Sequence, residues 1–192
     1  NSNGSADDSS DFAIRQAYVA LRRPIGNGID WKIGVFDSII GYESVASPNN
    51  PNYTRSYGHS IEPQTHTGAL ASYRFCDNIS ASAGIANTTG PHINARAHGE
   101  DDHAESFKTY MGSIALTAPD NWGFLSGSTL YGGVVNGFND NEQSGTDLEI
   151  TTTSWYAGAT LATPVTGLRF GASFDYLKYH GSPENNDTGG RE

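Results

Sequence analysis

The stretch Gly28-Ile29-Asp30-Trp31-Lys32-Ile33-Gly34-Val35-Phe36-Asp37-Ser38-Ile39-Ile40-Gly41-Tyr42 decides the fold class of this chain. Its odd-numbered positions from Ile29 to Ile39 are mostly large and apolar, whereas its even-numbered positions from Asp30 onward are mostly polar or small. A period of two residues is typical of a β-strand whose two faces meet different surroundings. The stretch therefore predicts a strand with one apolar face and one polar face.

The same alternation recurs along the chain and predicts about eight strands. The connections between them alternate in length, being short near Gly26, Asp77, Asn121 and Thr166 and long near Asn50, Ala95 and Asn141. Strands of about ten residues can cross a bilayer at a tilt, and outer-membrane barrels keep their long loops at one end. We expect strands over residues 12–22, 28–40, 66–75, 79–87, 107–118, 126–138, 153–163 and 168–176.

The composition is compatible with such a barrel. Hydrophobic residues make up 36% and charged residues 17% of the 192-residue chain, and 23 residues are glycine. Soluble domains average roughly 45–50% apolar residues when glycine is counted among them, and about 25% charged residues. A transmembrane β-barrel with a thin apolar coat and a polar interior has this composition, but so does a glycine-rich soluble barrel or sandwich. Composition alone leaves both classes open.

Several functions are disfavoured by charge and by missing motifs. The net charge of −10 and the lack of a basic stripe argue against nucleic acid as a partner. The single cysteine, Cys76, excludes an internal disulfide. No apolar run approaches the roughly 18 residues of a transmembrane helix, so a membrane crossing must use strands. Residues 1–8 do not read as a signal peptide. No nucleophile elbow, phosphate loop or dinucleotide fingerprint occurs, so we expect neither an enzyme nor a cofactor.

Charged side chains of the predicted strands fall mainly on the polar faces. A charge that faces lipid at mid-membrane costs roughly 2–4 kcal/mol, whereas a charge that faces a wet lumen costs little. The apolar faces are therefore predicted to meet lipid and the polar faces to line a lumen. The lumen-lining candidates are Arg22, Asp30, Lys32, Arg74, Arg169 and Asp175.

The long connection over residues 41–65 is the candidate for a constriction or mouth element. Its charges are mixed and could set a field across a pore, although a solvated external loop is an equally good interpretation. Its candidate residues are Glu43, Arg55, His59, Glu62 and His66. Lysine and arginine side chains on the lumen face favour the passage of anions, whereas acidic loops attract cations to the mouth. The ion selectivity therefore stays open.

The histidines of another long connection, His92, His98 and His103, lie near the acidic run Glu100 to Asp102. Their spacing matches no rigid metal site, and a solvated polar loop is the simpler interpretation. We therefore expect no metal site.

A series of short motifs adds a family resemblance. They are Gln16–Val19, Gly26–Asp30, Gly34–Asp37, Ile40–Glu43, Asn50–Tyr57, His66–Gly68, Val135–Phe138 and Trp155–Gly158. In this order, the chain resembles the β-barrel porins of the OmpL-like type over most of residues 12–180. The resemblance implies an outer-membrane channel for small hydrophilic solutes. Members of the family are usually longer and have more strands, and side chains would fill a closed barrel of eight strands.

These observations predict an all-β protein: a transmembrane antiparallel up-and-down β-barrel with about eight strands in this chain, part of a larger barrel. Residues 1–11 and 181–192 are expected to be polar segments, and residues 12–180 to carry the strands. The predicted function is a passive porin in the outer membrane of a Gram-negative-type bacterium. Its expected partners are outer-membrane lipid and small hydrophilic solutes or ions, and a homo-oligomer fits the class. Two alternatives stay open: a non-conducting barrel that acts as an anchor or adhesin, and a soluble ligand-binding barrel.

Overall fold

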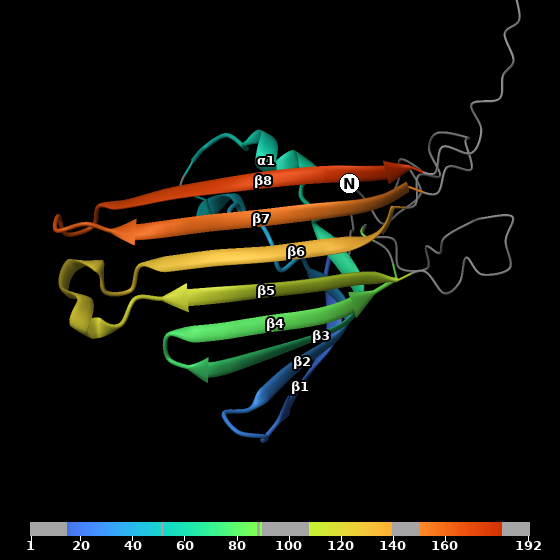
Figure 1. Ribbon diagram of the computed structural model, residues 1–192, viewed down its shortest axis with the longest axis horizontal. Helices are drawn as coiled ribbons and strands as arrows, with labels where there is room; N and C mark the ends of the chain where they lie inside the picture. The colour runs from blue at the N-terminus through green and yellow to red at the C-terminus, as the bar shows by residue number, and fades with distance from the viewer. Residues whose placement is uncertain (1–14, 51, 88, 90–107, 140–149, 182–192) are drawn as a thin grey trace, which may run out of the picture.

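Eight antiparallel strands form one curved sheet (Figure 1). The computed structural model describes residues 15–50, 52–87, 89, 108–139 and 150–181. The strands are β1 (Ala17–Arg23), β2 (Ile29–Asp37), β3 (Thr65–Cys76), β4 (Ile79–Ala86), β5 (Thr109–Thr117), β6 (Thr129–Asn139), β7 (Ile150–Ala162) and β8 (Arg169–Gly181). The helices are short: η1 (Ser47–Asn49), α1 (Tyr57–Ile61) and η3 (Asp120–Leu125). Within the described residues, no helix is long and apolar enough to cross a membrane.

The strand order follows the sequence from β1 to β8, and each strand pairs with the next in antiparallel fashion. The predicted all-β, up-and-down arrangement is therefore confirmed. The sheet is not closed: β1 and β8 are its two edges, and no pairing joins them in the described part of the chain. Figure 1 shows β1–β3 turning away behind the plane of β4–β8, so that the sheet curls around one of its faces.

The register sorts the side chains into an outer and an inner face. Directly paired residues of an antiparallel sheet share a face. One outward row, followed from β1 to β8, is Leu21, Trp31, Ala71, Ala83, Gly112, Val134, Trp155 and Tyr176. An inward row at the next level is Arg22, Asp30, Ser72, Ser82, Ser113, Gly133, Tyr156 and Asp175. The apolar and polar faces expected from the alternation are therefore the outer and inner faces of the curved sheet.

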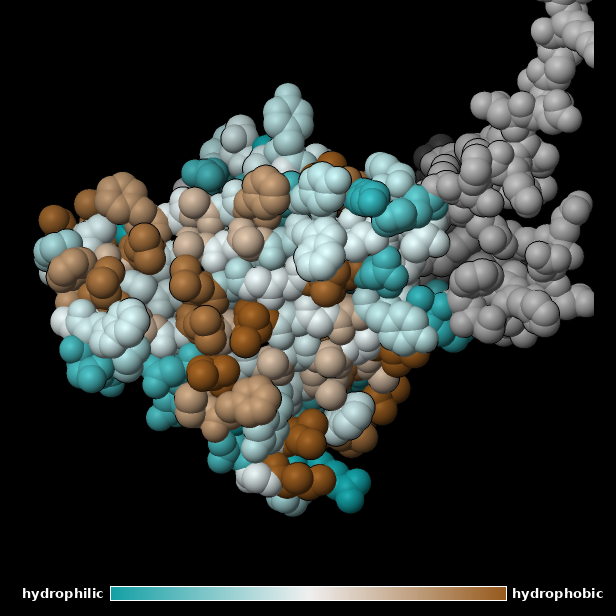
Figure 2. All heavy atoms as spheres, viewed as in Figure 1, coloured by the Kyte–Doolittle hydropathy of each residue, from teal (hydrophilic) through white to brown (hydrophobic). Residues whose placement is uncertain are grey.

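Large apolar side chains on the outer face are open to the surroundings. Phe170 is 63% exposed, Phe174 65% and Trp155 54%. Figure 2 shows hydrophobic residues gathered over the outer face of β4–β8, from mid-strand toward the short turns. Apolar surface that covers several neighbouring strands marks an interaction site, because water disfavours it.

The hydrophobic core cluster lies on the inner side. Phe36, Leu70, Met111, Val135 and Tyr156 come from five different strands and form one cluster with Ala86 and Ile40. Ile40 belongs to the connection between β2 and β3, so this connection supplies part of the core. The core therefore lies within the hollow of the curved sheet and not between two sheets.

Small residues permit the tight curl near β1–β4. A Cβ atom at Gly68 would lie 2.1 Å from the carbonyl oxygen of Ile85, and one at Gly34 would lie 2.3 Å from that of Ala17. Gly34 also has a φ of 131°, which disfavours side-chain-bearing residues. A larger residue at either position would force the neighbouring backbones apart.

The connections follow the expected alternation. Those at residues 24–28, 77–78, 118–128 and 163–168 join the strands at one end of the sheet, and the longer ones at the other end include residues 38–64. Several predicted strand boundaries are wrong. The first strand begins at Ala17 and not at residue 12, and the last continues to Gly181, past residue 176. The strand expected over 28–40 ends at Asp37, because Gly41, with a φ of 118°, lets the chain turn inward. The strand expected from residue 126 begins at Thr129, after η3, and the one expected from residue 153 begins at Ile150.

Candidate functional site

The connection between β2 and β3, residues 38–64, lies against the inner face of the sheet, and we call it the inner loop. The Cγ2 atom of Ile40 lies 2.5 Å from the position that a Cβ atom would take at Gly133 on β6. The hydroxyl group of Tyr42 lies even closer to the position that a Cβ atom would take at Gly171 on β8. In Figure 1 the inner loop runs behind β7 and β8, with α1 beside β8. The loop therefore crosses the hollow from β2 to the far edge strand.

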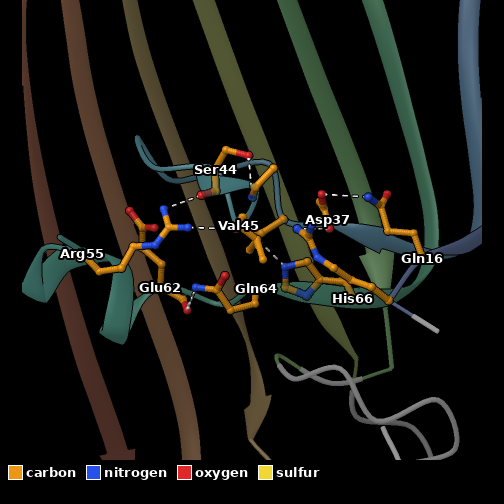
Figure 3. A network of polar contacts seen from close by, with 11 residues as sticks. Gln16, Asp37, Ser44, Val45, Arg55, Glu62, Gln64 and His66 are labelled. Carbon is orange, nitrogen blue, oxygen red and sulfur yellow. Dashed lines mark hydrogen bonds and ion pairs between the residues drawn. The ribbon is translucent and has the colours of Figure 1, made fainter. Parts of the chain in front are cut away.

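Polar contacts close the base of the inner loop (Figure 3). The backbone N–H of Ser38 donates to the carbonyl of Gln64 over 3.0 Å, and the Ser38 hydroxyl lies 3.2 Å from Nε2 of His66. His66 was grouped with the candidate residues of the loop, but it lies in β3, as the strand expected over residues 66–75 implies, and it is fully buried opposite Phe36. The alternation of the strand extends through this residue. The histidine therefore contacts the start of the loop, at Ser38, from the strand that follows the loop.

Two charged residues of the inner loop hold its own backbone. The guanidinium group of Arg55 donates to the carbonyl of Ser44 and, over 2.8 Å, to that of Val45 (Figure 3). The carboxylate of Glu43 accepts hydrogen bonds from the backbone N–H and the hydroxyl group of Ser56, at 3.1 and 3.2 Å. Both charges are thus used to fold the loop.

The helix α1 forms the part of the inner loop that lies beside β8. Ser56 caps its N-terminus by accepting from the N–H of His59 over 3.2 Å, and Glu62 ends it. The carbonyl of His59 accepts from the side chain of Gln64 over 2.9 Å, and the His59 ring is half-buried. These bonds hold the short helix and the turn after it, which carry Glu62.

Glu62 meets Asp175 of β8 through a hydrogen bond between the two carboxyl groups. Burial raises the pKa of Glu62 to about 8, and the hydrogen bond to Asp175 and the negative charges of Asp175 and Glu43 add to this rise. Glycines make room for the pair: a Cβ atom would lie 2.4 Å from Asp175 at Gly58 and 2.6 Å from Glu62 at Gly41. The pair is the polar attachment between the inner loop and the edge strand.

The charges on the strands share the inner face. By register, the six candidates Arg22, Asp30, Lys32, Arg74, Arg169 and Asp175 all point to this side. Arg22 lies 3.4 Å from Asp30, and the ammonium group of Lys32 lies 4.9 Å from the centre of the Tyr18 ring. Arg74 and Arg169 are exposed, and neither has an ion pair among the described residues.

A cavity of about 890 Å³ lies between the inner loop and β4–β8. Most of its wall carries hydroxyl, amide or small side chains, and Arg169 is the charged residue among those that line it within the described chain. The polar lining comprises Ser38, Tyr42, Asn49, Asn50, Asn52, Ser80, Ser82, Ser113, Tyr131, Tyr156, Thr160 and Arg169. Such a wall can hydrogen-bond water and hydrophilic solutes without a strong preference for one orientation.

The comparisons with known proteins agree with this architecture. A family model described as "Putative beta-barrel porin-2, OmpL-like" matches residues 1–190. The chain belongs to this family. Neither the curated proteins nor the solved structures gave a match. The matched range includes all eight strands and the inner loop, so the OmpL-like resemblance expected from short motifs is confirmed.

The residues of this OmpL-like chain that dock the inner loop were only partly predicted. Glu62 and Asp175 were named in separate groups, one for the loop and one for the lumen, and the structure brings them together. Ile40, Tyr42 and their partners Gly133 and Gly171 were not expected as a contact. Glycines at inward positions of the strands were the available signal, because a missing side chain leaves room for a loop. The histidine cluster near Glu100 lies outside the described residues, and the described part contains no group of residues that could hold a metal.

Proposed function

We propose that this chain belongs to an outer-membrane porin that passes small hydrophilic solutes by diffusion. Its strands form part of the wall of the pore, and its inner loop forms the constriction. The observation that carries the proposal is the inner loop, which lies across a polar inner face while the outer face stays apolar. In a membrane the outer face would meet lipid, and the loop would narrow the passage at the level of Glu62 and Asp175. Membership of an OmpL-like β-barrel porin family supports this interpretation.

The open edges β1 and β8 fit the proposal if further strands complete the ring. A wider ring leaves space beside the inner loop, whereas eight strands alone would leave an interior just wide enough for side chains. The described residues contribute an arc of wall, and the solute passes on the inner side of this arc. Catalysis plays no part in such a role.

Conductance across a planar lipid bilayer tests the proposal with the full-length protein. We expect discrete conductance steps, and larger steps when residues 45–61 are replaced by a short Gly-Ser linker. The matched control replaces residues 120–125, which form η3 in a short turn away from the inner loop. It should leave the step size unchanged. A pure, folded preparation that never conducts would contradict the porin role.

A non-conducting barrel is the second candidate, and the tight packing of the inner loop favours it. Ile40 is buried in the core cluster, and Val135 and Phe36 are fully buried beneath the loop. The loop-replacement variant separates the two roles. If the unmodified protein does not conduct but the loop-replacement variant does, the inner loop plugs the barrel. If neither protein conducts, the barrel acts as an anchor. The exposed Phe170 and Phe174 argue against the third alternative, a soluble barrel.

A further inference from the structure

Several positive charges of this acidic chain lie on the inner face of the sheet, and three of them are near the same end of the strands. The whole chain has a net charge of −10. On the inner face of the described strands, however, the register places four cationic side chains against two acidic ones. Three of the four cations, Arg22, Arg74 and Arg169, lie next to the short turns, on strands β1, β3 and β8.

The cations differ in how far neighbouring groups satisfy them. Arg22 has Asp30 at 3.4 Å, and Lys32 lies over the Tyr18 ring at 4.9 Å. Arg74 and Arg169 are exposed, and the described residues offer neither a carboxylate within salt-bridge distance. An arginine keeps its charge at all physiological pH values, so these two guanidinium groups contribute a permanent positive potential.

The carboxyl groups on the same side contribute less negative charge than their number suggests. Glu62 shares a hydrogen bond with Asp175, an arrangement that needs one proton between two carboxyl groups. Asp30 lies beside Arg22, and Glu43 accepts two hydrogen bonds from Ser56. The acidic groups are thus partly neutralised or occupied, whereas Arg74 and Arg169 are available to a solute.

Both arginines lie on the inner face, Arg169 in the wall of the cavity and Arg74 beside a residue of that wall. That residue is Ser80, which is paired directly with Arg74. Between them the wall presents hydroxyl groups, including those of Ser82 and Ser113. Guanidinium groups bind carboxylate and phosphate oxygens in a bidentate manner, and hydroxyl groups can donate to the same oxygens.

We propose that the passage along this inner face selects small oxyanions, carboxylates or phosphates, and that Arg74 and Arg169 are the residues that determine the selectivity. The inference rests on the porin role proposed above and names its substrate class. The electrostatic potential along the inner face determines which ions enter. A change of about one kT in the electrostatic energy of a monovalent ion changes its local concentration about threefold.

Reversal potentials of the full-length protein in planar bilayers test the inference. The measurement uses a gradient of potassium chloride and then of potassium acetate, near 0.1 M salt, where charges within about 10 Å still act. We expect both anions to be more permeant than potassium. The double variant Arg74→Gln and Arg169→Gln should lower the anion-to-potassium permeability ratio at least about threefold.

The matched control is Arg23→Gln, because Arg23 lies at the same end of the sheet but on the outer face, paired with Ile29. It should leave the permeability ratio unchanged. A cation-selective parent, or a double variant with the ratio of the parent, would overturn the selectivity while leaving the porin role intact. Absence of any conductance would refute the porin role itself and this inference with it.

Discussion

Glu62 at the end of α1 is hydrogen-bonded, carboxyl group to carboxyl group, to Asp175 on the edge strand β8. Two carboxyl groups make such a bond only while one of them keeps a proton. Burial and the charge of Asp175 raise the pKa of Glu62 to about 8, so the proton is held near neutral pH. The polar contact of the inner loop with the edge strand therefore depends on protonation.

The stability of the docked inner loop is expected to fall as pH rises from about 4.5 to about 8. The pKa of Glu62 is 4.5 when unperturbed and about 8 in the folded protein. The folded state thus binds more protons throughout this window, and its free energy of unfolding decreases with rising pH. Glu62 is partly exposed, so solvent screening limits the effect to about 1–2 kcal/mol. Urea unfolding of the detergent-solubilised protein at several pH values measures it.

The variant Glu62→Gln provides the control for this pH dependence. The amide can still donate a hydrogen bond to Asp175 but does not titrate, so the dependence should flatten. Glu43→Gln should largely keep the slope, because Glu43 makes its hydrogen bonds to Ser56. An unchanged slope in Glu62→Gln would assign the pH dependence to other groups.

Gly133 on β6 is expected to be essential for docking the inner loop. A Cβ atom at this position would lie 2.5 Å from Ile40, so Gly133→Ala pushes a buried side chain out of its place. Overpacking of this kind costs about 1–3 kcal/mol. Gly112→Ala on the neighbouring strand β5 is the matched control, because its Cβ atom would meet nothing closer than 3.9 Å. Thermal unfolding of both variants in detergent should show a lower midpoint for Gly133→Ala alone.

The sheet could be predicted from the sequence because its signal is local. Alternation in stretches such as Ile29–Asp37 depends on neighbouring residues only, and it assigned the faces of Trp31 and Lys32 correctly. Boundaries were less predictable where alternation continues past the strand. Ile39 and Ile40 read like further strand residues, but Gly41 turns the chain and tertiary packing buries Ile40.

The inner loop was predicted as a segment but not as a docked structure. Its contacts join Ile40 to β6 and Tyr42 to β8, positions separated by most of the chain, and no local pattern encodes such a pairing. The carboxyl pair shows the same limit. Glu62 and Asp175 each read as ordinary polar residues, and only the curl of the sheet places one against the other.

Opposite faces of β8 should respond differently to one added charge. Ala172 lies on the outer face and Ser173 on the inner face, and both are exposed. If the outer face meets lipid, Ala172→Arg should destabilise the protein in vesicles, by at most the roughly 2–4 kcal/mol of a midplane position, whereas Ser173→Arg should change stability little. Urea titration of folding into phosphatidylcholine vesicles gives both values. Equal costs at the two sites would contradict a lipid-facing exterior.

Arg55 is expected to control the mobility of the inner loop without affecting the sheet. Arg55→Lys removes the planar fork that joins the carbonyls of Ser44 and Val45, and a lysine cannot reproduce both bonds. Loss of these bonds should weaken the loop by about 1–3 kcal/mol. Hydrogen exchange should then show faster exchange of loop amides and unchanged exchange in β3–β7. Arg23→Lys on the outer face should alter neither, and equal protection of the loop in both variants would show that Arg55 does not hold it.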